Sequence, residues 1–288
     1  MLIQKRILVG LVGTNILESL APALHQDAMA AAGVDGHYHL MDLDVLKGRS
    51  LADILQAVRT AGFAGINVTH PFKEAVIPLL DAISPEAREI GAVNTVVIDG
   101  DGRTTGHNTD RIGFHRGFEE ALGGDAARDR TVVLVGAGGG GRAVAFALMD
   151  HGVASLRLHD TNRQRAAALC ADLAARFGAE RCEVAPELAP AVARAAGVVN
   201  ATPTGMRGYP GVPLPPDLLH KDRWIADIIY TPLETELVKL AQGKGCRTMN
   251  GGGMCVHQAA AAYRLFTGRE ADVVRMHRTF EAACARRS

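Results

Sequence analysis

The sequence has few cysteines and no excess of charge, and each absence excludes a class of protein. Its five cysteines are scattered, with no Cys-x-x-Cys pair, which argues against a disulfide framework and against a zinc site. Thirty-one basic residues balance 31 acidic residues, so the chain has no broad basic field to hold nucleic acid or an anionic membrane. We therefore expect neither partner, and any bound anion must be held by local donors.

A long apolar run is also missing. The first apolar stretch, residues 7–12, is too short to cross a bilayer, and no small-residue cleavage site follows it. Scattered, unpaired cysteines suit a reducing compartment. Together these features predict a cytoplasmic enzyme.

The length of 288 residues suits two domains, and the first half alternates apolar strand patterns with helical ones. This alternation predicts an α/β fold with a parallel or mixed sheet. A glycine-rich loop at 123–129 is expected to join the two domains. The predicted strands are 7–12, 37–43, 65–69 and 94–98, and the predicted helices are 23–32, 51–61, 74–80 and 111–122.

The second half opens with a continuous apolar run, Thr131–Val135, which is typical of a strand buried on both faces. A glycine cluster and a helix to Met149 follow. Further strands are predicted at 155–159, 198–200 and 224–227, and further helices at 163–177, 254–266 and 271–285.

The glycine cluster fits the pattern of a dinucleotide-binding turn. The segment Gly136-Ala137-Gly138-Gly139-Gly140-Gly141 reads G-x-G-x-x-G between a strand and a helix, where backbone N–H groups can approach a pyrophosphate. Asp160 follows Gly141 by nineteen residues, at the end of the next strand, where an acid can bind the adenine ribose 2′-hydroxyl. The alternative is a glycine-rich turn with a capping aspartate.

The cofactor preference follows from the charges near this turn. A carboxylate at Asp160 repels a 2′-phosphate, which favours NAD over NADP. Arg163 and Arg165 lie just downstream and offer guanidinium groups to such a phosphate, so NADP stays possible.

Polar segments follow the predicted strands of the first half. Ser19, the segment from Asn67 to Lys73, the Asn94-Thr95 pair and the Asn108-Thr109-Asp110 triplet supply amides, hydroxyls, one ammonium and one carboxylate. This mixture suits a small polyol that carries a carboxylate. Histidines and acids do not cluster at metal-ligand spacing here, so no metal is expected.

Oxidation of an alcohol by hydride transfer also needs a group that accepts the hydroxyl proton. Lys73 is the candidate, with Asp110 to orient it. The alternatives are a solvated residue at a helix start for Lys73 and an N-cap for Asp110.

Several segments together resemble the shikimate/quinate dehydrogenase family. Asn67-Val68-Thr69-x-Pro71-x-Lys73, Gly91-Ala92-Val93-Asn94-Thr95 and Asn108-Thr109-Asp110 are similar to its substrate motifs, in the family's order. The later motifs with the same resemblance are Asn200-Ala201-Thr202-Pro203-Thr204-Gly205-Met206, Asp227-x-x-Tyr230-x-Pro232 and Gly251-Gly252-Gly253-Met254-x-x-x-Gln258.

The resemblance implies an architecture and a reaction. Residues 1–109 form a substrate-binding domain, and helices from 254–288 pack back on it. Residues 110–253 form a Rossmann-like domain that binds NAD or NADP. The active site lies in the cleft between the two domains. The implied reaction interconverts shikimate and 3-dehydroshikimate, or quinate and 3-dehydroquinate, by hydride transfer.

The resemblance also implies roles for single residues. The implied catalytic pair is Lys73 and Asp110. The implied substrate ligands are Ser19, Asn67, Thr69, Asn94, Tyr230 and Gln258. The implied cofactor contacts, beyond the residues of the glycine turn, are Asp160, Arg163, Thr202, Met206 and Gly253.

Two departures from the family pattern suggest a catabolic or specialised paralogue. Many members carry a second hydroxyl residue at the position of Ala21, and the loss of a hydrogen bond to a charged group costs about 1.5–3 kcal/mol. Asp160 stands where NADP-using relatives carry a basic segment. The open alternatives are an amino analogue of shikimate as substrate, a folate-linked dehydrogenase, and a non-catalytic dinucleotide sensor. A monomer and a homodimer are both compatible with the sequence.

Overall fold

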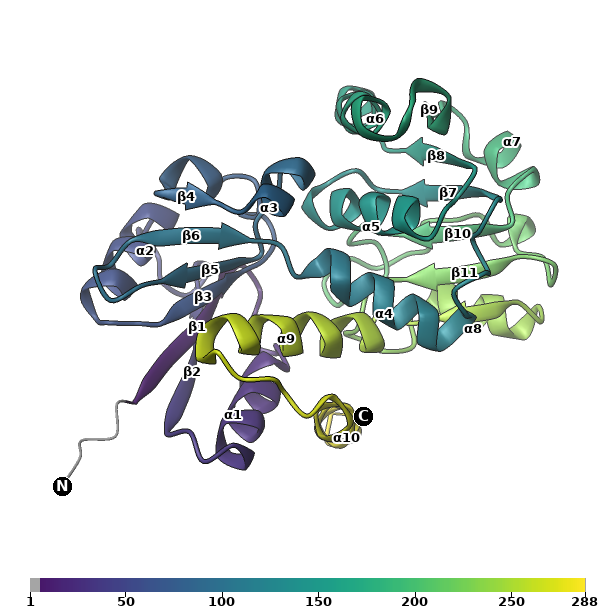
Figure 1. Cartoon of the computed structure of the whole chain (residues 1–288). Helices are drawn as coiled ribbons and strands as arrows, with labels where there is room; N and C mark the ends of the chain where they lie inside the picture. The colour runs from purple at the N-terminus through teal and green to yellow at the C-terminus, as the bar shows by residue number, and fades with distance from the viewer. Residues whose placement is uncertain (1–5, 288) are drawn as a thin grey trace. The chain divides into compact units, whose positions relative to one another are not determined.

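The chain divides into two compact units, each with its own sheet (Figure 1). The computed structural model describes residues 6–287. One unit comprises the described residues up to Thr109 together with those from Gln258 onward, and the other comprises Asp110–His257. The division falls within helix α9 (Gly252–Thr267). The predicted α/β fold class is confirmed.

The first unit is built on a six-stranded mixed sheet in the order β2-β1-β3-β5-β6-β4. Strands β2 and β3 run parallel to β1, β4 runs parallel to β6, and β5 runs antiparallel to β3 and β6. The strands are β1 (Ile7–Gly13), β2 (Gly36–Asp42), β3 (Gly65–Val68), β4 (Ala82–Ile83), β5 (Thr95–Ile98) and β6 (Thr104–His107).

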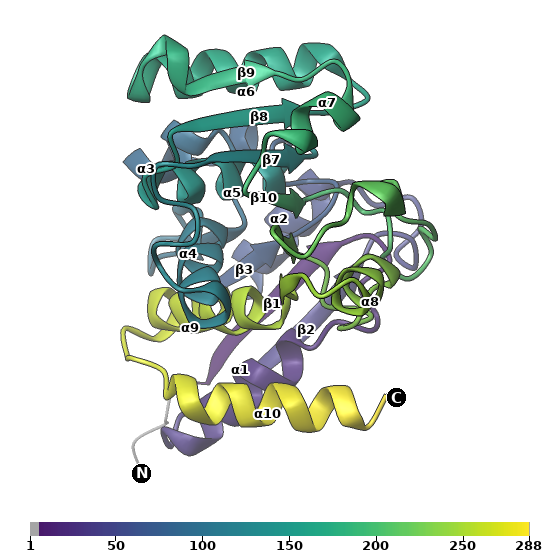
Figure 2. The same ribbon diagram turned by 90° about the vertical axis from the view of Figure 1, so that its right-hand side faces the viewer.

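Helices α1 (Ala21–Ala31), α2 (Leu51–Thr60), α3 (Pro85–Ile90) and α10 (Val273–Ala285) complete the first unit. Helix α2 begins with a capping box between Ser50 and Asp53, and its apolar face packs into the core of the unit. Helix α10 packs along α1 (Figure 2), where the Arg275 guanidinium pairs with both oxygens of Asp27 at 2.7 Å.

The helix predicted at 74–80 is wrong. The structure has only a 3-10 turn there, η1 (Ile77–Leu79). Pro78 explains the difference, because proline lacks an N–H and disfavours the α conformation in the residue before it. The other elements predicted in the first half are present with bounds that differ by at most two residues.

The second unit has a parallel sheet in the order β12-β11-β10-β7-β8-β9. The chain leaves β7 in one direction to β8 and β9, then returns to the other side of β7 through β10. This is the strand order of a doubly wound dinucleotide-binding fold, with its switch point between β7 and β10. The strands are β7 (Thr131–Val135), β8 (Ser155–His159), β9 (Cys182–Val184), β10 (Gly197–Asn200), β11 (Trp224–Asp227) and β12 (Arg247–Met249).

Helices α4 (Asp110–Leu122) and α5 (Gly139–Asp150) pack against each other in this unit. Since α4 also packs on β12, the loop at 123–129 lies inside the second unit, and the prediction that this loop joins the domains is wrong. The other elements are α6 (Arg163–Phe177), α7 (Leu188–Ala193) and α8 (Glu236–Gly243), with short 3-10 turns η2 (Ala179–Arg181) and η3 (Pro216–Leu218).

Among residues 6–287, no helix is both long enough and apolar enough to cross a membrane.

Candidate active site

Polar side chains of the first unit gather at one edge of its sheet. The carboxyl ends of β1, β3 and β6 meet the amino end of β5 there, because β5 runs antiparallel to both of its neighbours (Figure 1). The register pairs Asn67 with Thr95, and Thr95 with His107. Because ligands of open α/β sheets bind outside the carboxyl ends of the strands, this edge is the candidate substrate site.

Three of the predicted substrate ligands are joined at this edge by a buried hydrogen-bond network. Asn67 Nδ2 donates to Thr95 Oγ1 at 2.9 Å and to the carbonyl oxygen of Asn94 at 3.3 Å. Asn94 Oδ1 accepts from the backbone N–H of Thr109 at 2.7 Å, and Asn94 Nδ2 donates to Thr109 Oγ1 at 2.9 Å. Thr109 Oγ1 lies 3.5 Å from Gln258 Oε1. The two asparagines and the two threonines are buried, so the network holds the amides in fixed orientations.

Tyr38 of β2 orients Asn67 of β3 across the intervening strand β1, and the sequence alone does not predict this role. The Tyr38 hydroxyl donates to Asn67 Oδ1 at 2.8 Å, and the ring stacks on His25 with centroids 4.6 Å apart. Burial lowers the pKa of His25 to about 3, so its imidazole is neutral at physiological pH. Tyr38 lies in no polar motif, and only the pairing of β1 with β2 and β3 brings it to Asn67.

Lys73 is half-buried in the loop that follows β3. Its carbonyl oxygen accepts from the N–H of Val93 at 2.8 Å, which ties this loop to the segment before β5. The pKa of His70 is lowered, first by burial and then by the charge of Lys73, so the two side chains lie within each other's field. The backbone therefore brings the loop that carries Lys73 to the polar edge.

Ser19 and Thr69 lie beyond the end of β1. Ser19 Oγ accepts from the backbone N–H of Ala21 at 3.2 Å. A methyl group on Gly13, the last residue of β1, would meet Thr69 Cγ2 at 2.4 Å, so Thr69 packs directly against that strand end. Thr69 thus belongs to the polar edge of the first unit, and Ser19 lies in the loop that follows β1 in the chain.

Asp110 directly follows Thr109 and is the first residue of α4. It is buried, and the helix dipole favours a carboxylate in the first turn. Asp110 belongs to the second unit by its contacts, whereas Lys73 belongs to the first. The two predicted catalytic residues therefore come from different units.

The fold requires glycine at two positions of the glycine turn in the second unit but not at a third position. Gly136 has φ +100° and follows β7 directly, and a methyl group on Gly141 would meet the carbonyl oxygen of Gly136 at 2.1 Å. Gly138 caps α5 with an extended backbone, and a methyl group there would meet nothing nearer than Arg165 Nη1 at 4.0 Å. The first and third glycines allow the tight approach of helix to strand, while the second leaves open space where a pyrophosphate is held in such turns. The residues present therefore fit a dinucleotide.

Asp160 is fixed against this turn. It follows β8, and its Oδ2 accepts from the N–H of Ala137 at 2.8 Å while its Oδ1 accepts from the N–H of Asn162 at 2.7 Å. Arg163 is exposed at the start of α6, as is Arg165. The carboxylate and the two guanidinium groups thus lie at the carboxyl end of the strand next to β7, where the sequence predicts the adenine ribose.

The ends of β10 and β11 carry a buried polar network that gives shape to the loop after β10. Asn200 Nδ2 donates to Asp227 Oδ1 at 3.1 Å, and Asn200 Oδ1 accepts from Thr202 Oγ1 at 2.7 Å. Asp227 also accepts from the N–H of Ile229 at 3.1 Å and from Thr235 Oγ1 at 2.8 Å. Burial raises the pKa of Asp227 to about 6, and these hydrogen bonds only partly offset the effect.

The remaining predicted contacts all lie in the second unit. Thr202 and Met206 are half-buried in the loop after β10, and Tyr230 is half-buried in the loop after β11. A methyl group on Gly253 would lie 3.2 Å from Gly117 Cα, so this glycine serves the close packing of α9 against α4.

Models of known families match both ends of the chain. The shikimate dehydrogenase substrate binding domain matches residues 11–96, and the shikimate 5′-dehydrogenase C-terminal domain matches residues 251–279. The first match contains the polar edge of the first sheet, and the second contains Gln258.

Similar proteins extend the match over nearly the whole chain. A quinate/shikimate dehydrogenase (NAD(+)) of Corynebacterium efficiens is 48% identical over 95% of this chain and 97% of its own length. A shikimate dehydrogenase (NADP(+)) of Streptomyces avermitilis is 47% identical over 95% of this chain and 94% of its own. The solved quinate dehydrogenase from Corynebacterium glutamicum in complex with NAD superposes with a TM-score of 0.88, at 46% identity, over 96% of this chain and all of its own.

Proposed function

This chain belongs to the shikimate/quinate dehydrogenase family, and from that premise we propose that it oxidises quinate and shikimate with NAD in preference to NADP. It is an NAD(P)-dependent oxidoreductase. We assign substrate binding to the unit that contains the polar edge, and dinucleotide binding to Asp110–His257.

The observation that carries the cofactor preference is the fixed carboxylate of Asp160. Both of its oxygens accept hydrogen bonds from backbone N–H groups, so the orientation of the Asp160 carboxylate toward the proposed ribose position is fixed. A ribose 2′-hydroxyl can donate to this carboxylate, whereas a 2′-phosphate is repelled by it. Arg163 and Arg165 are exposed, whereas two backbone N–H groups hold the Asp160 carboxylate at the glycine turn.

In the proposed reaction, Lys73 moves the proton. The bound nicotinamide supplies the acceptor for the hydride of the ring carbon. Lys73 Nζ takes the hydroxyl proton as the carbonyl forms, and its ammonium form polarises the ketone oxygen in the reverse direction. Asp110 is the second member of the proposed catalytic pair.

Asn67, Asn94 and Gln258 hold the substrate hydroxyls in this proposal. Asn67 Oδ1 already accepts from Tyr38 and has a second lone pair for a ring hydroxyl. Ser19 Oγ and Thr69 Oγ1 supply hydroxyl donors, and Ala21 supplies none.

The test is a set of initial rates for quinate and shikimate, each with NAD and NADP, followed by the absorbance of the reduced cofactor. Lys73→Ala is expected to lower kcat by about 10²–10⁴ with a smaller change in KM, because it removes the proton acceptor and leaves the amides in place. Lys47→Ala, an exposed lysine of the same unit, is the matched control and is expected to keep wild-type rates.

Two results would contradict the proposal. Equal kcat values for Lys73→Ala and wild type would show that Lys73 does not accept the proton. A higher kcat/KM with NADP than with NAD would mean that Arg163 and Arg165 select the cofactor, and that Asp160 does not.

A further inference from the structure

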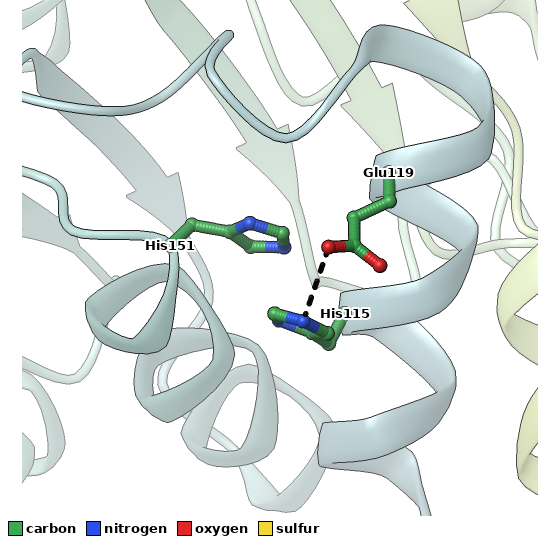
Figure 3. A group of neighbouring side chains, drawn as sticks. All are labelled: His115, Glu119 and His151. Carbon is green, nitrogen blue, oxygen red and sulfur yellow. Dashed lines mark ion pairs between the residues drawn. The ribbon is translucent and has the colours of Figure 1, made fainter.

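A second group of side chains, outside the proposed active site, converges between two helices of the second unit. His115 and Glu119 are one turn apart on α4, and His151 directly follows α5 (Figure 3). Each offers one ligand atom, and these atoms all lie within 4.8 Å of one another. His115 Nε2 lies 3.5 Å from Glu119 Oε1, close to the separation of about 3.4 Å expected for two ligands of tetrahedral zinc.

Two buried nitrogens of this group have no hydrogen-bond partner within the described part of the chain. They are His115 Nδ1 and His151 Nε2. His151 is only 5% exposed, and its ring points toward Glu119 and His115 (Figure 3). A buried polar atom without a partner costs about 1–3 kcal/mol, and a metal bound at His151 Nε2 would give that nitrogen a partner. Burial also lowers the pKa of His151, which favours the neutral imidazole that binds metals.

The neighbouring charges leave this group accessible to a cation. Arg116 pairs with the other oxygen of Glu119, Oε2, at 3.2 Å. Arg111 pairs with both oxygens of Asp150 at 2.7 Å. Each nearby guanidinium group is thus balanced by a carboxylate, and Glu119 Oε1 still faces the two imidazoles.

We propose that His115, Glu119 and His151 form a binding site for a divalent transition metal, with Zn²⁺ as the preferred ion. Two imidazole nitrogens and one carboxylate oxygen are a ligand set that zinc takes, with water in the fourth position. Magnesium and calcium prefer sets made of oxygen alone.

Binding requires a rotation of one ring. The two imidazoles are stacked, with centroids 4.1 Å apart and planes within 17°, so their lone pairs do not yet meet at one point. His115 is partly exposed, at 25% of its side chain, and its rotation gives up the 3.5 Å contact with Glu119 and the stacking on His151. The metal replaces these contacts with a bond to each residue.

The consequence is a cross-link between α4 and α5. His151 lies at the carboxyl end of α5, whereas Gly138 caps its amino end. A twelve-residue helix is about 18 Å long, so the metal is too far from the glycine turn to take part in dinucleotide binding. The ion therefore stabilises the second unit and leaves the proposed chemistry unchanged.

The test is isothermal titration calorimetry of the full-length, chelator-treated protein with ZnCl₂. Wild type is expected to bind one Zn²⁺ per chain and to gain thermal stability from it. Glu119→Gln is expected to weaken this binding by more than about tenfold, because loss of a ligand costs more than loss of a residue that merely supports one. His151→Gln is expected to do the same, but it alters a buried position, so the partly exposed Glu119 gives the safer variant.

Two controls separate this site from other histidines. Glu120→Gln changes the adjacent residue of α4, whose carboxylate lies 2.8 Å from His257 Nε2, and is expected to bind Zn²⁺ like wild type. The double variant His37→Gln/His39→Gln removes two exposed imidazoles of β2 and is expected to behave in the same way. Cobalt(II) provides a spectroscopic check, because a tetrahedral site gives it a strong visible absorption that Glu119→Gln should lose.

The proposal is overturned if Glu119→Gln binds Zn²⁺ as tightly as wild type. It is also overturned if the binding disappears in either control, since the ion then lies on other residues. MgCl₂ is expected to give no heat above that of dilution, and equal binding of Mg²⁺ would exclude a site of the proposed chemistry.

Discussion

At the scale of single residues, the environment of a side chain decides what its chemistry can do. The carboxylates of Asp160 and Asp227 both accept backbone N–H groups in the same unit. Asp160 is half-exposed at the glycine turn, whereas Asp227 is buried within a network of three donors. The same functional group is therefore assigned to cofactor selection in one case and to loop structure in the other.

Asp160→Asn is expected to reduce the preference for NAD. The substitution removes the negative charge that repels a 2′-phosphate, and a hydrogen bond to a charged group is worth about 1.5–3 kcal/mol. The ratio of kcat/KM with NAD to that with NADP should therefore fall by at least about tenfold. Asp125→Asn, an exposed carboxylate of the same unit, is expected to leave the ratio unchanged. An unchanged ratio in Asp160→Asn would show that another group selects the cofactor.

At the scale of elements, the glycines between β7 and α5 serve different purposes. Gly141 allows the helix to pack closely on the strand, whereas Gly138 leaves space for a ligand. Gly141→Ala would place a methyl group 2.1 Å from the Gly136 carbonyl oxygen, whereas Gly138→Ala meets no atom nearer than 4.0 Å. The fold thus excludes a side chain at the third glycine and tolerates one at the second.

This difference predicts opposite effects for the two alanine variants. Gly141→Ala is expected to lower the melting temperature, since overpacking costs about 1–3 kcal/mol. Gly138→Ala is expected to keep the wild-type melting temperature but to weaken NAD binding in calorimetric titration, because its methyl group occupies the space left for the pyrophosphate. Wild-type NAD affinity in Gly138→Ala would show that the cofactor does not approach this turn.

The buried network at the ends of β10 and β11 leads to a prediction of how the stability of the protein depends on pH. The pKa of Asp227 is about 6 in the folded protein and 3.8 as its ordinary value, so the folded state holds the proton more tightly. The stability that this provides is complete below pH 3.8 and is lost as the pH rises through about 6, by an amount of about 3 kcal/mol.

The measurement compares wild type with Asp227→Asn by urea unfolding at pH 4.5 and pH 7.5, at the two sides of the window set by the folded pKa. All other titratable groups are the same in the two proteins, so their contributions cancel in the difference between the two free energies of unfolding. Wild type should become less stable relative to the variant as the pH rises. A difference that stays constant would mean that Asp227 titrates alike in the folded and unfolded chains.

At the scale of the whole molecule, the balance of charge limits long-range attraction. Thirty-one basic and 31 acidic residues give no net field to draw in an anionic substrate or cofactor. The groups proposed to bind substrate and cofactor act at short range, and two of them, Asn67 and Asn94, belong to a buried hydrogen-bond network.

The value of kcat/KM should therefore depend little on salt. Raising the ionic strength from low to moderately high NaCl is expected to change it by less than about threefold, because buried and short-range contacts are weakly screened. A fall of tenfold or more would indicate electrostatic steering by a charged surface that the composition conceals.

The sequence by itself determined the parts of this protein that depend on short stretches of chain. The β7 run, the glycine turn after it and Asp160 at the next strand end could be placed because each depends on residues near one another in sequence. The helix predicted at 74–80 is absent for an equally local reason, because Pro78 lies within that segment. Strands of two or three residues, such as β4 and β12, are too short for an alternating pattern to show.

Only the tertiary structure decided which distant residues meet. Sheet pairing brings Tyr38 to Asn67, burial raises the pKa of Asp227, and the packing of α4 on α5 sets His151 beside His115. None of these contacts leaves a periodic or spacing signal, because the partners lie on separate elements and their meeting depends on strand order and helix packing. The sequence could propose the chemistry of each side chain, but the partners, the burial and the orientation of that side chain are properties of the folded chain.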